Sequence, residues 1–143
     1  MNIELLRTLQ ARIFDQLEAS YPNEGGGFLL GKLRDDTVII EDVVPIDNVF
    51  AAEEQHHRYT MTPQDWMRLE DEAEARGLAL VGYYHSHPDS PAFPSEFDRD
   101  RAMPNFAYLI TSVMRGRATE MQGWRLVTDH SRFESEPVLL REF

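Results

Sequence analysis

The most constraining segment of this sequence is the apolar run of residues 78–87, which reads LALVGYYHSH. Its unbroken apolar character and its two tyrosines predict a buried central β-strand. The run ends at His85 and His87, and side chains two residues apart on a strand share a face. The chain is therefore expected to fold around a sheet whose central strand carries two imidazoles on one side of its end.

The first third of the chain predicts a helix followed by a hairpin. Apolar residues spaced three and four apart over residues 2–20 predict one helix with a single core-facing stripe. Residues 24–33 and the β-branched run 37–46 flank a polar turn, so we expect two antiparallel strands there. The aperiodic stretch 46–61 predicts a long surface loop with a short strand near residues 58–61. The expected helical stripe consists of Ile3, Leu6, Leu9, Ile13 and Leu17.

The rest of the chain predicts a second helix, a short third helix and three further strands. Thr62 and Pro63 are typical of a helix start, and this helix is expected to end at Gly77. A short helix is expected from Ser95, after a proline-broken loop. The order predicts an α/β fold, a mixed sheet flanked by two longer helices and one short helix, as a single domain over residues 1–143. The inward positions of the second helix are Trp66, Leu69 and Ala73, and the strands are expected at 106–114, 118–127 and about 133–140.

Composition removes several classes of function. The chain has 143 residues, no cysteine and a formal charge of −11. Disulfides, thiolate nucleophiles and cysteine-ligated metals are thereby excluded. The acidic balance argues against nucleic-acid partners, which bind mainly through Lys and Arg. No apolar run approaches the ~18 residues of a membrane span, so we expect a cytoplasmic protein without membrane contact, of undetermined oligomeric state.

The two histidines of the central strand are candidate metal ligands. Catalytic zinc sites use three protein ligands, commonly two His and one carboxylate, and leave the fourth position to water. Asp98 falls at the start of the short helix, and the intervening PDSPAFP loop could fold that helix back over His85 and His87. The sequence therefore predicts a zinc ion held by these three side chains.

Each of these residues also has a purely structural interpretation. The histidines could be ordinary core or surface residues, and Ser95 with Asp98 three residues later is a plausible helix capping box. The combined spacing, His-x-His, seven residues, Ser, two residues and Asp, favours the metal site over separate structural roles. The remaining histidines fall at no motif position and are expected on the surface. They are His56, His57 and His130.

Two other motifs compete with this interpretation. Residues 26–32 match most of the phosphate-loop pattern GxxxxGK, but Leu33 stands where Ser or Thr is required and a strand follows in place of a helix. Nucleotide binding is therefore disfavoured. His85-x-His87-x-Asp89 resembles the start of the metallo-β-lactamase signature, but Ser90 stands where the next His belongs. That pattern leaves open only whether Asp89 contacts the metal.

The spacing as a whole, with Glu24 in YPNEGGGFLLG upstream of HSHPDSPAFPSEFD, resembles the JAMM family of zinc metalloproteases, also called JAB or MPN-plus. The resemblance implies an MPN-like domain with one zinc ion on His85, His87 and Asp98. It also implies catalytic roles for two further residues. Glu24 would be the general base and then the general acid, and Ser95 would donate to the oxyanion of the tetrahedral intermediate.

The resemblance also implies a substrate class. Short prokaryotic members act on ubiquitin-like sulfur-carrier proteins, so we expect a peptidase or isopeptidase that hydrolyses the amide bond after a C-terminal Gly-Gly tail. Such a tail could add as a strand to an exposed edge, for which residues 46–61 are the candidate. The competing class is an inactive MPN-like scaffold. Such modules lose metal ligands, whereas this sequence has all three together with Glu24.

Overall fold

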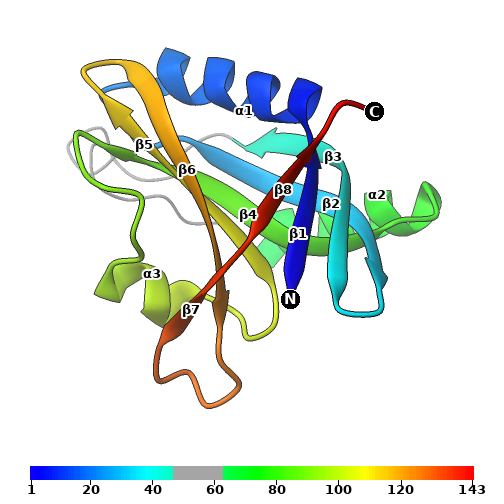
Figure 1. The fold of residues 1–143 in the computed structure, drawn as a ribbon. Coiled ribbons are helices and arrows are strands. Elements are labelled where there is room, and N and C mark those ends of the chain that lie inside the picture. Colours follow the sequence, from blue (N-terminus) through cyan, green and yellow to red (C-terminus); the bar gives the residue numbers. More distant parts are fainter. Residues whose placement is uncertain (47–62) are drawn as a thin grey trace.

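The computed structural model describes residues 1–46 and 63–143, which form an eight-stranded mixed sheet with three helices (Figure 1). The order of the strands across the sheet is β7-β6-β5-β4-β2-β3-β1-β8. The strands are β1 Asn2–Leu6, β2 Gly26–Arg34, β3 Thr37–Ile46, β4 Ala79–Pro88, β5 Ala107–Met114, β6 Arg117–Leu126, β7 Phe133–Glu136 and β8 Val138–Arg141. The helices are α1 Arg7–Ser20, α2 Pro63–Ala75 and α3 Glu96–Arg101.

The predicted hairpin and central strand are confirmed. β2 and β3 pair antiparallel, with Gly26 opposite Ile46 and Arg34 opposite Thr37. β4 lies in the middle of the sheet, antiparallel to β2 and parallel to β5. The seven residues from Val81 to His87 are all buried, as the apolar run predicted. The candidate ligands on β4 are therefore carried by a buried strand in the middle of the sheet.

The N-terminus differs from the single helix predicted for residues 2–20. Residues 2–6 form β1, which lies parallel to both β3 and β8, and α1 begins at Arg7. Ile3 and Leu5 are buried at alternate positions, which is the period of a strand, whereas the helical prediction paired Ile3 with Leu6. Only the distant partners decide between these alternatives. The helical part of the stripe is confirmed at Leu9, Ile13 and Leu17.

The C-terminus also differs, because the single strand expected near 133–140 is two strands. Pro137 separates β7 from β8, and these pair with β6 and β1 at opposite ends of the strand order. The sheet therefore curls until its two edges meet, and Figure 1 shows β8 and β7 following one another across it. A Cβ on Gly123 of β6 would lie 2.7 Å from a methyl of Val138, so only glycine allows this approach.

The helices cover both faces of this curled sheet. α1 packs Leu9, Ile13 and Leu17 on one face, within a large aliphatic core. α2 packs Leu69 on the other face, against Phe28 of β2. Leu69 and Ala73 are buried as predicted. The side chain of Trp66, the predicted loop after Ile46 and the predicted strand at 58–61 lie outside the described residues.

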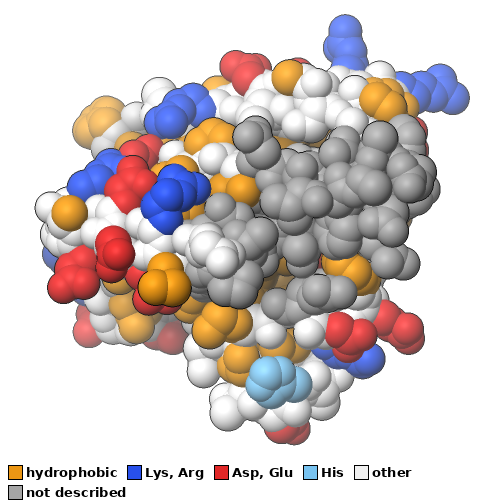
Figure 2. Space-filling model, turned by 180° about the vertical axis from the view of Figure 1, so that it is seen from behind, with side chains coloured by type: hydrophobic (Ala, Val, Ile, Leu, Met, Phe, Trp, Pro, Cys, Tyr) orange, Lys and Arg blue, Asp and Glu red, His pale blue; other side chains and the backbone are white. Residues whose placement is uncertain are grey.

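The surface carries charged side chains among apolar ones. On the face shown in Figure 2, acidic and basic side chains of the described residues are interspersed with apolar ones. Among the described helices, none combines the length and the apolar character that a bilayer crossing requires.

Candidate metal centre

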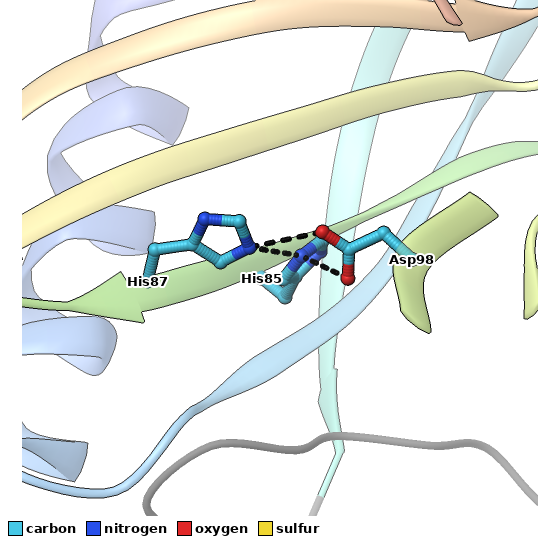
Figure 3. A group of neighbouring side chains, drawn as sticks. All are labelled: His85, His87 and Asp98. Atoms are coloured by element: carbon cyan, nitrogen blue, oxygen red, sulfur yellow. Dashed lines mark hydrogen bonds and ion pairs between the residues drawn. The ribbon is translucent and has the colours of Figure 1, made fainter. Parts of the chain in front are cut away.

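The end of β4 and the start of α3 bring three candidate ligands together (Figure 3). The Nε2 atom of His85 lies 3.1 Å from Oδ1 of Asp98, and Nε2 of His87 lies 3.0 Å from Oδ2. The two Nε2 atoms are 3.2 Å apart. Donors at zinc bond lengths of 2.0–2.1 Å in a tetrahedron are separated by roughly 3.3 Å. The described arrangement therefore fits one small tetrahedral cation without rearrangement of the backbone.

His87 is oriented by the loop that follows it. Its Nδ1 atom lies 3.0 Å from the carbonyl oxygen of Pro91, so the proton on Nδ1 is donated there. This hydrogen bond selects the tautomer whose Nε2 lone pair faces Asp98. An imidazole held in this way is ready to act as a metal ligand through Nε2.

His85 is held differently from its neighbour. Its ring stacks on Tyr83, with the centroids 5.4 Å apart and the planes at 20°. Its Nδ1 atom is buried and has no hydrogen-bond partner among the described residues. Packing on Tyr83 and the Nε2 contact with Asp98, rather than a bond at Nδ1, therefore set the orientation of this second imidazole.

The electrostatics of the group favour a bound cation. Burial would raise the pKa of Asp98, but the charges of His85 and His87 and their hydrogen bonds outweigh burial and hold this pKa far below its usual range. Burial would lower the pKa of His87, but Asp98 outweighs it and raises that pKa above its ordinary value. A buried carboxylate thus remains charged between two imidazoles, and a divalent cation at the same point would supply the compensating charge.

The capping-box interpretation of Ser95 is also correct. Ser95 Oγ accepts the backbone N–H of Asp98 at 3.0 Å, and Asp98 Oδ2 accepts the backbone N–H of Ser95 at 2.9 Å. The cap and the candidate metal site therefore coexist, because the carboxylate that caps α3 also faces both histidines. The cap fixes Asp98 in the orientation that the metal site needs.

Glu24 and Ser95 line the same pocket as His87. A cavity of about 310 Å³ is lined by Glu24, His87 and Ser95, with Phe93 and the proline-rich loop. Glu24 is buried at 7% exposure, immediately before β2, whereas Ser95 is exposed. The pocket thus joins Glu24 and Ser95 to His87, which also belongs to the ligand group with His85 and Asp98.

The loop between β4 and α3 is anchored by residues that the sequence analysis did not select. Trp124 of β6 donates its indole N–H to the carbonyl oxygen of Ala92 at 3.0 Å, and Phe93 packs edge-on against its ring. Ser112 of β5 donates to the carbonyl oxygen of Ser90 at 2.6 Å. No spacing in the sequence pointed to these contacts, since β5 and β6 are distant from the motif.

The competing motifs take no part in the described site. Asp89 accepts hydrogen bonds from the Tyr21 hydroxyl and from the backbone N–H of Arg115, both at 2.7 Å. It therefore anchors the loop instead of joining the ligand group. Residues 26–32 belong to strand β2, which rules out a phosphate loop. His130 is exposed, as expected, whereas His56 and His57 lie outside the described residues.

Two curated proteins share sequence with this chain. Desampylase from Haloferax volcanii is 37% identical over 92 residues, which span 64% of this chain and 63% of that protein. A probable TtuB-protein conjugate cleaving protease from Thermus thermophilus is 33% identical over 89 residues, 62% of this chain and 55% of that protein. The chain thus spans less than two thirds of the length of either relative.

Solved structures reproduce the fold. The solution structure of protein DSY2949 from Desulfitobacterium hafniense matches with a TM-score of 0.85 at 25% identity, over 99% of this chain and 94% of that one. The crystal structure of AF2198, a JAB1/MPN domain protein from Archaeoglobus fulgidus, matches with a TM-score of 0.56 at 17% identity, over 97% and 99% of the two chains. The fold is therefore the MPN-like α/β fold that the sequence predicted.

The family assignment follows from the fold, the convergent ligand group and a match that covers most of the chain. The family model described as prokaryotic homologs of the JAB domain matches residues 6–127. The matched region includes both histidines, Asp98, Ser95 and Glu24. This chain belongs to the family of prokaryotic JAB-domain homologues.

Proposed function

We propose that this protein is a zinc-dependent peptidase or isopeptidase that hydrolyses the amide bond after the C-terminal Gly-Gly tail of a ubiquitin-like sulfur-carrier protein. One observation carries the proposal. His85, His87 and Asp98 converge with donor atoms 3.0–3.2 Å apart, and Glu24 lines the same pocket. An inactive scaffold has no need of this buried, polar and compactly arranged group.

The proposed ligands of one zinc ion are Nε2 of His85, Nε2 of His87 and a carboxylate oxygen of Asp98. Two nitrogens and one oxygen are a donor set that zinc accepts readily, and they leave a position open for substrate or water. When bound in such a set, zinc lowers the pKa of a coordinated water to about 7 and polarises the substrate carbonyl.

Glu24 is the proposed proton carrier. Its carboxylate would accept a proton from the attacking water and return it to the departing amine, which leaves as a neutral group. Burial at 7% exposure, beside the ligand group, keeps bulk water from competing for that proton. Ser95 Oγ accepts the backbone N–H of Asp98 through a lone pair, which leaves its O–H proton for the developing oxyanion.

The proposed substrate class rests on the depth of the site and on the relatives. The three ligands are only 3–8% exposed, so a chain that reaches them needs residues with small side chains, and glycine has none. Of the two relatives, one is called desampylase and the other a probable TtuB-protein conjugate cleaving protease. The segment proposed to receive the tail, 46–61, lies outside the described residues except for Ile46.

The proposal treats residues 1–143 as one domain. The family match over residues 6–127 supports this organisation, as does the sheet, in which β1 and β8 pair although they come from opposite ends of the described chain.

Cleavage of a defined fusion tests the function. We would incubate the protein with a sulfur-carrier protein extended beyond its Gly-Gly and quantify the cleaved carrier by mass spectrometry, with and without chelator. We expect cleavage that chelator abolishes and added zinc restores. Glu24→Gln should retain zinc and lose activity by a factor on the order of 10² to 10⁴.

The matched control is Glu120→Gln, which changes an exposed glutamate of β6 in the same way and should leave the rate unchanged. Protein that binds no zinc and cleaves nothing would favour the scaffold. Full activity of Glu24→Gln would contradict the assigned proton carrier even if the metal were confirmed by elemental analysis.

A further inference from the structure

We propose that Ser86, the residue between the two histidines, is a positioning residue of the reaction: its hydroxyl fixes the backbone of Gly25 and so holds the Glu24 carboxylate toward the pocket. The proposal rests on the role assigned to Glu24 above. It adds a function for a residue that binds no metal and touches no substrate.

Ser86 holds Gly25 by both of its backbone polar groups. The Gly25 N–H donates to Ser86 Oγ at 3.0 Å, and the Ser86 N–H donates to the Gly25 carbonyl oxygen at 3.0 Å. Ser86 is fully buried and Gly25 is buried as well, so no solvent replaces these bonds. A buried backbone N–H without an acceptor is strongly disfavoured, and Gly25 is therefore tied to the hydroxyl.

These two bonds extend the sheet by one residue at the point where its ladder ends. The last pair of β2 and β4 is Gly26 with His85. Gly25 therefore continues the pairing with β4, opposite Ser86. Because side chains alternate along strands, pairing Gly25 with Ser86 on one face places Glu24 and His87 on the other, where both line the pocket.

Helix α1 closes the same segment from the opposite side. A Cβ on Gly25 would lie 2.5 Å from Ser20 Oγ and 3.2 Å from a Leu17 methyl, so the helix leaves no room for a side chain there. Gln16 donates its amide N–H to the carbonyl oxygen of Gly26 at 2.9 Å. The segment after Glu24 is thus clamped between α1 and β4, and the hydroxyl of Ser86 accepts the Gly25 N–H.

The chain provides a matched comparison for this hydroxyl. Thr111 of β5 is the register partner of Ser86 across the β4–β5 pairing, and it is equally buried. Its Oγ1 atom has no hydrogen-bond partner among the described residues. Loss of the Thr111 hydroxyl therefore changes polarity at the same depth in the sheet without releasing Gly25.

The test compares Ser86→Ala with Thr111→Val in the zinc-loaded protein, using the carrier fusion described above. We expect Ser86→Ala to keep its zinc and its KM while kcat falls about 10- to 100-fold, since displacing a reacting group by an ångström costs up to ~10² in rate. Thr111→Val should keep the wild-type kcat. The double variant Ser86→Thr with Thr111→Ser moves one methyl group between neighbouring positions, restores the hydroxyl and should recover kcat.

A double-mutant cycle shows whether Ser86 acts through Glu24. In the Glu24→Gln background, adding Ser86→Ala should change the residual rate by no more than about twofold, because the group it positions is already absent. An equal further loss in that background would overturn the proposal. So would a wild-type kcat in Ser86→Ala, or an equal fall of kcat in Thr111→Val.

A readout independent of activity separates this proposal from the proposed function. Amide hydrogen exchange of Gly25, followed by NMR, should be slow in the wild type and in Thr111→Val and at least tenfold faster in Ser86→Ala. If the wild type cleaves no fusion, the proposed function is wrong, while the exchange rate of the Gly25 amide still shows whether Ser86 holds Gly25. If the Gly25 amide exchanges equally fast in all three proteins, the clamp is wrong even in an active enzyme.

Discussion

The two faces of the sheet are built on the same strands but are held together in different ways. On the α1 face, aliphatic side chains of the helix and the sheet form one large core, which includes Leu29 of β2 and Leu109 of β5. On the opposite face, their neighbours Phe28 and Tyr108 belong to a smaller, largely aromatic cluster. The histidines of β4 continue that second face beyond Tyr83, where hydrogen bonds replace apolar packing.

The two faces of the sheet therefore have separate roles, one in stability and the other in the candidate metal site. Alternation along β4 sends Tyr84 into the aliphatic core while Tyr83 and His85 point to the other face. The strand is thus anchored by one set of side chains while the other set is available for a polar site. Ser86 is the exception, because it belongs to the anchored face yet contacts the backbone next to Glu24.

The largest effect on zinc binding and cleavage is expected from substituting His87 on the polar face of the sheet. His87→Ala removes one of three converging ligands, and we expect zinc binding and cleavage to fall below detection. In chelator, its melting temperature should stay within about 5 °C of the wild type, since the aliphatic core is intact. Elemental analysis and thermal unfolding check this. His130→Ala, an exposed histidine, should retain the full zinc content.

The aliphatic face should show the opposite pattern. Ile13→Ala leaves a cavity under α1 at a fully buried position, so the free energy of unfolding should drop by about 2–5 kcal/mol. Zinc content and kcat per folded molecule should not change. Urea titration measures the stability, and Asp15→Ala, on the exposed side of α1, should remain within about 0.5 kcal/mol of the wild type. Loss of zinc from folded Ile13→Ala would show that the two faces are not independent.

A smaller effect is expected from the contact that anchors the ligand loop. Trp124→Phe keeps an aromatic ring beside Phe93 but removes the indole N–H bond to the Ala92 carbonyl, at a cost of about 1 kcal/mol in stability. Because the Pro91 carbonyl orients His87, zinc affinity should weaken by about 10-fold. Competition with a zinc chelator measures the affinity. An unchanged affinity would show that this hydrogen bond does not contribute to the metal site.

The smallest effect concerns an ion-pair cluster between the helices. Asp42 of β3 lies 2.6 Å from Arg76 and 3.3 Å from Arg12. Burial would raise the pKa of Asp42, but the hydrogen bond with Arg76 and the further contacts lower it. Because these arginines are substantially exposed, Asp42→Asn should cost less than about 1 kcal/mol at pH 7.

The lowered pKa of Asp42 fixes the direction of the pH dependence. A carboxyl whose pKa is lower in the folded state stabilises the protein above its unfolded pKa of about 3.9, and this contribution is lost as pH falls through the folded value. The difference in melting temperature between the wild type and Asp42→Asn should therefore be constant above about pH 5 and shrink below pH 4. A difference that grows on acidification would contradict the assigned sign.

Local patterns predicted the hairpin, the central strand, the second helix and the part of the first helix, predicted over residues 2–20, that begins at Arg7. They could not predict β1, because Ile3 with Leu5 fits a strand while Ile3 with Leu6 fits a helix, and the deciding partners lie in β3 and β8. They also could not split the last strand at Pro137, since that division depends on the sheet curling until β6 approaches β8. Both errors concern pairings between distant segments.

For the site, the spacing of His85, His87, Ser95 and Asp98 was sufficient to predict their convergence, because a strand, a short loop and a helix start leave few ways to arrange them. Glu24 was found only through the family resemblance. The sequence analysis missed Trp124, Ser112 and Ser86. Each contributes a hydrogen bond to the backbone of a distant residue, and such bonds produce no periodic pattern in the sequence.

The sequence by itself determined which chemical groups this protein has and the strand and helix that carry most of them, because alternation and capping act over a few residues. Only the tertiary structure decided which groups meet across the fold: Glu24 beside His87, Ser86 on Gly25, and β7 and β8 on opposite edges of one curled sheet. The physical reason is that these contacts depend on burial and on strand pairing between distant segments, which no local pattern specifies.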